Sequence, residues 1–202
     1  MKAAAKQQSR FAQRATSAFS DAMLAALGRK DFKNITVNEI CQACNYPRST
    51  FYNYFDDLFG LMDYCWGRIG TELEFESFLD IPVEQRTAVL FEKAYNYMSA
   101  RSEDIARIVR HNGADGLMVQ SANRFIREKI KSFLMACSQA RNNVVGLDIL
   151  AEHYSNTIQM LLSRCFLQEG RMTKQEAMTA LEYLIGTLER EEFSKCLTEK
   201  RT

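Results

Sequence analysis

Apolar residues recur every three to four positions along most of the chain, a spacing that predicts amphipathic helices rather than strands. The first such run covers residues 8–27, and Gly28 follows it as a typical residue beyond a helix end. Further helices are expected at about 83–100, 102–112, 117–140, 146–169 and 173–197. Only 2 Pro and 9 Gly occur in 202 residues, too few for the many turns of an all-β fold. The sequence therefore predicts an all-α fold.

Between residues 35 and 58 the pattern predicts two short helices joined by a tight turn. Ile35, Thr36 and Glu39 form a hydrophobic staple residue and a capping box, which start a helix of about two turns. Asn45 tolerates the left-handed conformation and can end that helix. Pro47 is favoured at the start of the next helix, which we expect at about 48–54. This arrangement is a helix-turn-helix.

The second of these helices has a core face and an outward face. Phe51 and Phe55 are four residues apart and are expected to point into the core. The polar and aromatic residues left largely outward or at the edges are Arg48, Ser49, Tyr52, Asn53 and Tyr54. A further helix, capped by Asp56-Asp57, is expected to start near Leu58 and to run towards Phe78.

Charge is unevenly distributed along the chain. Residues 1–55 carry 8 Lys/Arg and 3 acidic residues, whereas the remainder carries 18 Lys/Arg and 22 acidic residues. A basic first quarter suggests an anionic partner for the N-terminal part, although a chance distribution of surface charge would look the same. Guanidinium, amide and hydroxyl groups at Arg48, Asn53 and Ser49 are of the types that contact base edges and phosphates.

The 6 cysteines do not indicate a metal or redox centre. Cys41 and Cys44 form a CxxC pair, but neither histidine is near in sequence, and the βαβ context of a thioredoxin-like site is missing. We interpret both as small apolar residues of a packed helix. The start of the chain does not resemble a signal peptide, and no apolar run approaches the ~20 residues that cross a bilayer. A cytoplasmic protein with reduced thiols, no metal and no cofactor is expected.

The stretch TVNEICQACNYPRSTFYNYF resembles the N-terminal DNA-binding segment of the TetR/AcrR family of bacterial transcription regulators. Residues that match or conservatively replace the family pattern are Thr36, Ile40, Cys44, Asn45, Thr50, Tyr52 and Phe55. Two positions depart from it: Pro47 replaces the usual Ser, and Leu58, after Asp56-Asp57, occupies the region of a usual phosphate-binding lysine.

The resemblance implies an N-terminal three-helix DNA-binding head (1–56) and a larger helical ligand-binding and dimerisation domain (57–202). It implies that the helix at 48–54 enters the major groove, with DNA contacts from Thr36, Pro47, Arg48, Ser49, Thr50, Tyr52, Asn53 and Tyr54. It also implies a homodimer formed by the last two helices, an operator of double-stranded DNA, and a possible small hydrophobic or aromatic ligand bound by unknown residues. Repression is the common outcome in that family.

Two alternatives remain open from the sequence. An enzyme built on the same helices would need a catalytic constellation, and no G-x-S-x-G, HExxH or P-loop motif is present. A regulator-like protein that acts through a protein partner, with weak or no operator binding, is consistent with the acidic pair at 56–57 and with Leu58.

Overall fold

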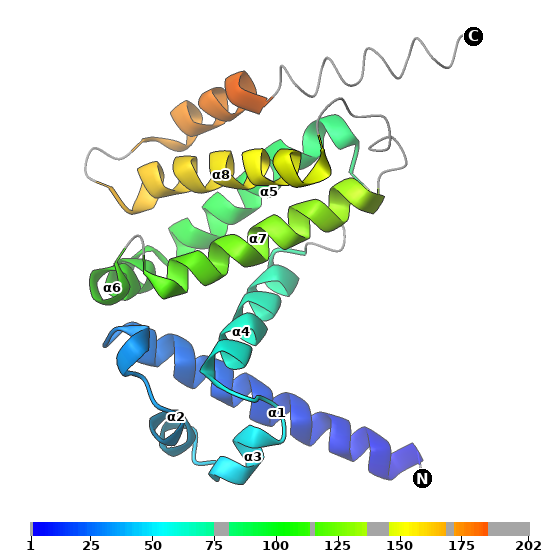
Figure 1. The fold of residues 1–202 in the computed structure, drawn as a ribbon, viewed down its shortest axis with the longest axis vertical. Helices are drawn as coiled ribbons and strands as arrows, with labels where there is room; N and C mark the ends of the chain where they lie inside the picture. Colours follow the sequence, from blue (N-terminus) through cyan, green and yellow to red (C-terminus); the bar gives the residue numbers. More distant parts are fainter. Residues whose placement is uncertain (1, 75–80, 114–115, 137–145, 169–171, 186–202) are drawn as a thin grey trace. The chain divides into compact units, whose positions relative to one another are not determined.

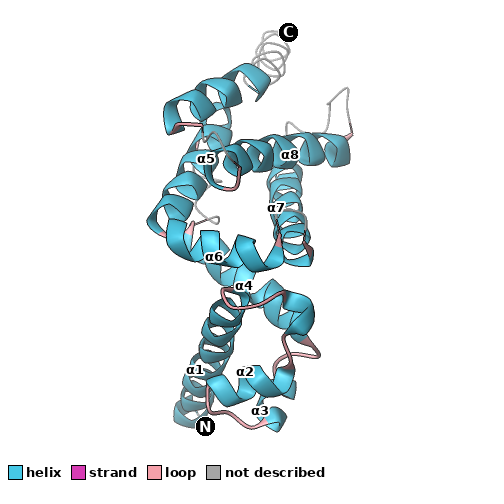
Figure 2. Ribbon diagram, turned by 90° about the vertical axis from the view of Figure 1, so that its left-hand side faces the viewer, coloured by secondary structure: helices cyan, strands magenta, loops and turns pink. Residues whose placement is uncertain are grey.

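The computed structural model describes residues 2–74, 81–113, 116–136, 146–168 and 172–185, with the backbone alone for residues 2–9, 83 and 84. All regular structure in these ranges is helical, which confirms the predicted all-α class (Figure 1, Figure 2). The chain forms two compact units. The first comprises Met1–Ile69 and Glu103–Ser121, and the second comprises Gly70–Ser102 and Ala122–Thr202.

The first unit contains the predicted helix-turn-helix. Its elements are α1 (Lys2–Leu27), the 3-10 helix η1 (Phe32–Asn34), α2 (Val37–Ala43), α3 (Arg48–Tyr52), most of α4 (Leu58–Glu72), α6 (Ser102–Asn112) and the start of α7 (Leu117–Ala136). α1 begins at Lys2 rather than at residue 8, and the short η1 was not predicted from the pattern. The compact unit thus extends beyond residues 1–56 and also includes most of α4, α6 and the start of α7. The assignment of residues 1–56 as the DNA-binding domain stays a prediction.

Helix α4 is shorter than predicted. It ends at Glu72 instead of running towards Phe78, and Glu74 has a left-handed φ of 55°. A left-handed residue cannot continue a right-handed helix, so the chain turns there. The end predicted at Phe78 lies outside the described residues.

An aromatic core holds the first unit together. Phe19 of α1 is fully buried and its ring lies 5.4 Å from the Phe51 ring, 6.2 Å from the Phe55 ring and 5.4 Å from the Tyr46 ring. The Phe51 and Phe55 rings are nearly perpendicular to the Phe19 ring, an arrangement that is favourable beyond the buried area, whereas the Tyr46 ring is tilted by 46°. One residue of α1 therefore anchors both the helix-turn-helix turn and α3.

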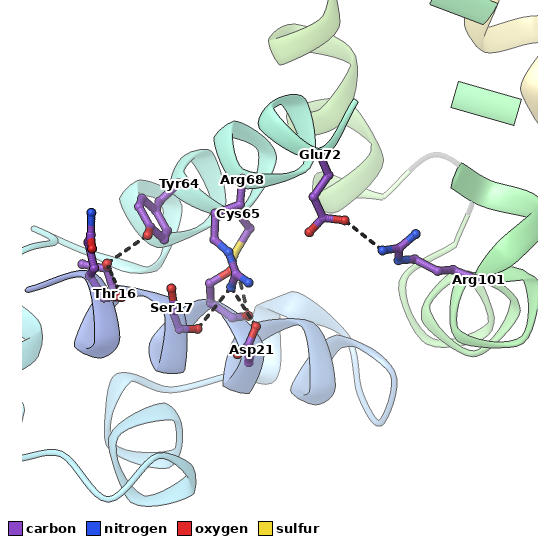
Figure 3. A network of polar contacts seen from close by, with 10 residues as sticks. Thr16, Ser17, Asp21, Tyr64, Cys65, Arg68, Glu72 and Arg101 are labelled. Carbon is purple, nitrogen blue, oxygen red and sulfur yellow. Dashed lines mark hydrogen bonds and ion pairs between the residues drawn. The ribbon is translucent and has the colours of Figure 1, made fainter. Parts of the chain in front are cut away.

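Polar contacts join α1 to α4 within this unit (Figure 3). Tyr64 donates its hydroxyl to Thr16 at 2.9 Å, and Arg68 pairs with Asp21 at 2.7 Å while also donating to the Ser17 carbonyl. These bonds lie along one side of α1. They fix the rotation of α4 about its own axis relative to α1, because they are spaced one turn apart on both helices.

Asn112, the last residue of α6, ties that helix to the end of α1. Its amide nitrogen donates to the carbonyls of Leu27 and Ile108 at 2.9 Å, and its amide oxygen accepts from the Phe32 N–H at 2.8 Å. Leu27 is the last residue of α1, so its carbonyl has no partner within that helix. The buried amide satisfies this group together with the first N–H of η1.

The second unit has a separate apolar core. It contains α5 (Val83–Ala100), the rest of α7, α8 (Leu147–Phe166) and a helix at 174–185. Phe91, Ile158 and Ile185 are among its fully buried side chains. The capping box predicted at Thr173 and Glu176 is present in both directions, at 2.8 Å and 3.2 Å. The segments predicted as helix at 137–140 and 186–197 lie outside the described residues.

The chain around α4 and α5 is also held by ion pairs within the second unit. Arg101 pairs with Glu72 at 2.8 Å (Figure 3). Its guanidinium carbon lies 3.8 Å from the centre of the Tyr97 ring. None of the helices in the part of the chain that the structure describes has the length and apolar character needed to cross a bilayer.

Candidate nucleic-acid interface

Local sequence signals determine the turn between α2 and α3. The Thr36 hydroxyl accepts from the Glu39 N–H at 3.3 Å and caps α2. Asn45 has the left-handed φ of 55° expected at the turn. Pro47 lies at the N-cap of α3, one position before the helix. The fixed φ of proline and the absence of an N–H suit this position, so the turn predicted from the sequence is confirmed.

Two phenylalanines fix which face of α3 points outward. Phe51 is fully buried and Phe55 is nearly so, as predicted from their spacing. Because α3 is only five residues long, burial of Phe51 leaves most of its remaining surface exposed.

The predicted contact residues fall into two groups. The exposed ones are Thr36, Pro47, Arg48, Ser49, Tyr52 and Asn53. Thr50 and Tyr54 are half-buried, and Tyr54 packs against the core of the unit. The structure therefore gathers Arg48, Ser49, Tyr52 and Asn53 on the outer surface of one short helix and its end, with Tyr54 at the margin.

Arg48 and Tyr52 form a pair across one turn of α3. The guanidinium donates to the Tyr52 hydroxyl at 3.3 Å, and its carbon lies 5.8 Å from the ring centre. This hydrogen bond raises the pKa of Arg48 above its already high ordinary value, so the group stays charged. The pair holds a cation and a phenol side by side on the exposed face.

The sequence did not single out two α2 residues of this surface. Asn38 and Gln42, together with Asn45 and Arg48, line a hollow of about 350 Å³ beside the turn. Amides and a guanidinium make this hollow rich in hydrogen-bond donors. The sequence carried a signal for them, since Asn38 and Gln42 are polar residues four apart and so share one face of α2.

Charges near the surface modify the expected basicity. Lys30, one of the basic residues of the first quarter of the chain, pairs with Glu39 at 2.6 Å. Asp56 and Asp57 are both exposed, and Asp57 accepts from the Gly60 N–H at 2.8 Å as the cap of α4. Leu58 is half-buried. Asp57 therefore has a role in helix capping that does not depend on a partner molecule.

The CxxC cysteines pack as expected. Cys41 is buried, and Cys44 is half-buried and donates its thiol to the Ile40 carbonyl at 3.1 Å. Burial raises the pKa of both thiols, which disfavours the thiolate needed for metal binding. Among the described residues no group of three or more His, Cys, Asp or Glu side chains could hold a metal ion.

No protein-family model matches the chain, and no curated protein matches its sequence. Solved structures do match it. The TetR transcriptional regulator from Streptococcus agalactiae 2603V superposes with a TM-score of 0.58 at 17% identity, over 89% of this chain and 98% of that one. A protein from Syntrophomonas wolfei strain Goettingen, assigned to the TetR family, gives 0.61 at 13% identity, over 85% and 93%. The chain has the TetR-family fold.

A third structure with this fold was solved with a ligand. The transcriptional regulator FadR from Bacillus subtilis, in complex with stearoyl-CoA, gives a TM-score of 0.58 at 15% identity, over 84% of this chain and 97% of that one. The TetR fold confirms, at the level of fold, the resemblance drawn from residues 36–55. All three matched proteins are described as transcriptional regulators.

Proposed function

We propose that the chain is a bacterial, cytoplasmic one-component transcription regulator that binds a pseudo-palindromic DNA operator as a homodimer. The observation that carries the proposal is the exposed face of α3, where Arg48, Ser49, Tyr52 and Asn53 surround a fully buried Phe51. A short helix anchored from behind, with donors and acceptors on its outer face, suits insertion into the major groove. Residues 1–56 would form the DNA-binding domain.

Residues 57–202 would bind a small hydrophobic or aromatic ligand and form the dimer. The stearoyl-CoA complex of FadR, a protein with the same fold, supports a small ligand for this chain. α4 contributes residues to both compact units, so a shift of α4 is a direct route from a ligand to α3. The ligand would act through different affinities for the states that can and cannot bind DNA, with repression relieved on binding.

The test is selection of sites from a random pool of double-stranded DNA, followed by binding of the best site. Arg48→Ala should reduce discrimination between this site and random DNA by about 1–3 kcal/mol while leaving the thermal midpoint unchanged, because the side chain is exposed. Ser132→Ala on α7 is a matched control, since its exposed hydroxyl bonds only within its own helix.

The second candidate function is a regulator that acts through a protein partner. Exposed Asp56 and Asp57 beside α3, and the pairing of Lys30 with Glu39, favour it. Absence of any enriched sequence from a folded dimeric sample would support this alternative and reject operator binding.

A further inference from the structure

A second basic surface of the first unit lies on α1, outside the helix-turn-helix. Arg10 and Arg14 are exposed and four residues apart, so they share one face of the helix. In the sequence, Lys2 and Lys6 precede them at the same interval, and no acidic residue occurs before Asp21. Over these residues the charge is of one sign only.

The face is also hollowed. Arg10, Gln13, Arg14, Ser17, Ala18 and Asp21 line an open groove of about 540 Å³ along α1. Gln13 and Ser17 add hydrogen-bond donors to the two guanidinium groups. The acidic residue at the far end, Asp21, is already paired with Arg68 at 2.7 Å. The groove therefore offers donors and positive charge without an unpaired carboxylate.

Three other cations of the unit have ion-pair partners among the described residues. Lys30 pairs with Glu39, Arg68 with Asp21 and Arg107 with Asp104. Arg10 and Arg14 have no ion-pair partner within the part of the chain that the structure describes. An exposed arginine in a groove of donors, without an internal partner, is free to bind an external anion.

This surface lies at the same end of the unit as α3. In Figure 1 and Figure 2 the N-terminal end of α1 and α3 lie at the same end of the first unit. Phe11, between Arg10 and Arg14 in the sequence, places its ring 6.1 Å from that of Tyr46. Tyr46 directly precedes Pro47, the cap of α3. A duplex held by α3 would thus continue past the first turns of α1.

We propose that the α1 basic face (Arg10, Gln13, Arg14 and Ser17) binds the phosphate backbone of duplex DNA that flanks the base pairs read by α3. This inference rests on the proposed function, and it adds a contact surface that lengthens the bound DNA on each side. The contact is to phosphates, so it contributes affinity and salt dependence without sequence preference. An anionic membrane or an acidic protein segment would be a different partner for the same charges.

The experiment crosses two duplexes with four proteins. One duplex carries the selected site with ten flanking base pairs on each side, and the other is trimmed to the selected base pairs. The proteins are the wild type, Arg10→Gln/Arg14→Gln, Arg48→Ala, and Arg110→Gln as the matched control. Arg110 is an exposed arginine of the same unit on α6, and it forms no ion pair among the described residues.

The readout is the slope of log K against log salt concentration. Each neutralised phosphate contributes about 0.9 to this slope, so the double variant should lower it by roughly 1.8 per protomer on the long duplex. On the trimmed duplex, the double variant and the wild type should converge. Sequence preference, helix content by circular dichroism and the behaviour of Arg110→Gln should stay as in the wild type.

Three results would overturn the inference, and each can be distinguished from failure of the proposed function. If Arg10→Gln/Arg14→Gln matches the wild type on both duplexes while Arg48→Ala loses specificity, operator binding stands and the α1 basic face does not bind DNA. If the double variant weakens binding to phosphatidylglycerol vesicles and not to DNA, the partner is a membrane surface. If no sequence is enriched for the wild type, the salt slope on random duplex still decides: an unchanged slope rejects the α1 basic face.

Discussion

At the scale of single residues, Asn112 joins the end of α6 to the end of α1 and the start of η1. Its amide is buried and bonds to groups at Leu27 and Phe32 that are 85 and 80 residues away in the sequence. Removing a partner from a buried donor or acceptor costs its desolvation, about 1–3 kcal/mol. We therefore expect Asn112→Ala to lower the free energy of unfolding by about 2–3 kcal/mol, measured by urea denaturation.

Asn34→Ala is the matched control for this change, because Asn34 is an exposed amide at the end of the η1 segment. It should alter the free energy of unfolding by less than about 0.5 kcal/mol. Equal effects of the two substitutions would show that the Asn112 side chain adds nothing beyond the helix position that it occupies.

Residues with local partners were predictable and Asn112 was not. The roles of Thr36, Asn45 and Pro47 depend on neighbours within about four positions, so spacing alone identified the cap, the left-handed turn and the start of α3. Asn112 looked only like a helix end, since nothing in a linear pattern reveals a partner 85 residues away.

At the scale of elements, the two adjacent acidic residues before α4 have different roles. Asp57 caps the helix through the Gly60 N–H, whereas Asp56 is exposed and makes no such bond in the described structure. Loss of a capping side chain costs about 0.5–2 kcal/mol. Asp57→Ala should therefore destabilise the protein by about 1 kcal/mol and Asp56→Ala by much less, measured by thermal unfolding. A larger effect at Asp56 would contradict the capping assignment.

The helix at 174–185 should have a pH-dependent start. The Thr173 backbone N–H, and then its hydroxyl, bond to the Glu176 carboxylate and lower its pKa. A lowered folded-state pKa stabilises the fold above the unfolded pKa of about 4.3, and this contribution is lost as the pH falls through the folded value. The wild type should exceed Glu176→Gln in free energy of unfolding at pH 7, and the gap should narrow as the pH falls below the unfolded pKa and through the folded one.

Urea unfolding of both proteins across that pH range measures the gap, and Glu182→Gln serves as a control. Glu182 is an exposed glutamate later in the same helix, outside the first turn where the box forms. A gap for Glu176→Gln that does not vary with pH would mean that the amide replaces the carboxylate fully in the capping box.

The boundaries of elements were less predictable than their existence. α2, α5 and α6 match their predicted ranges closely, since caps and apolar spacing coincide there. α1 starts earlier than predicted because residues 2–7 lack the apolar spacing that was used to recognise it, although Ala and Gln are good helix formers. Arg10 and Arg14 lie within the helix predicted at 8–27, but a charge count over residues 1–55 does not show that they line one groove with Gln13 and Ser17.

At the scale of the whole molecule, the proposed dimer predicts that exposed apolar residues on the last two described helices are covered by a second copy. Ile149 and Met160 lie on the outer side of α8 and are 64% and 47% exposed, and Tyr183 on the helix at 174–185 is 79% exposed. Residues 149 and 160 are three turns apart on one face. Large apolar side chains exposed on the last two described helices suit a symmetric four-helix interface between two copies.

Charging this surface should produce monomers that remain folded. We expect Met160→Lys/Tyr183→Lys to sediment as a monomer at concentrations where the wild type is a dimer, because two lysines per protomer would meet their symmetry mates. Met135→Lys is the matched control, since Met135 is 65% exposed and belongs to α7 rather than to the last two described helices. The monomer should lose the preference for a palindrome over a single half-site, while base preference within the half-site persists, because α3 and its anchor Phe51 belong to the other compact unit. A double variant that still sediments as a dimer would place the interface elsewhere, and a monomer that keeps the palindrome preference would mean that the DNA, not α8, brings the two copies together.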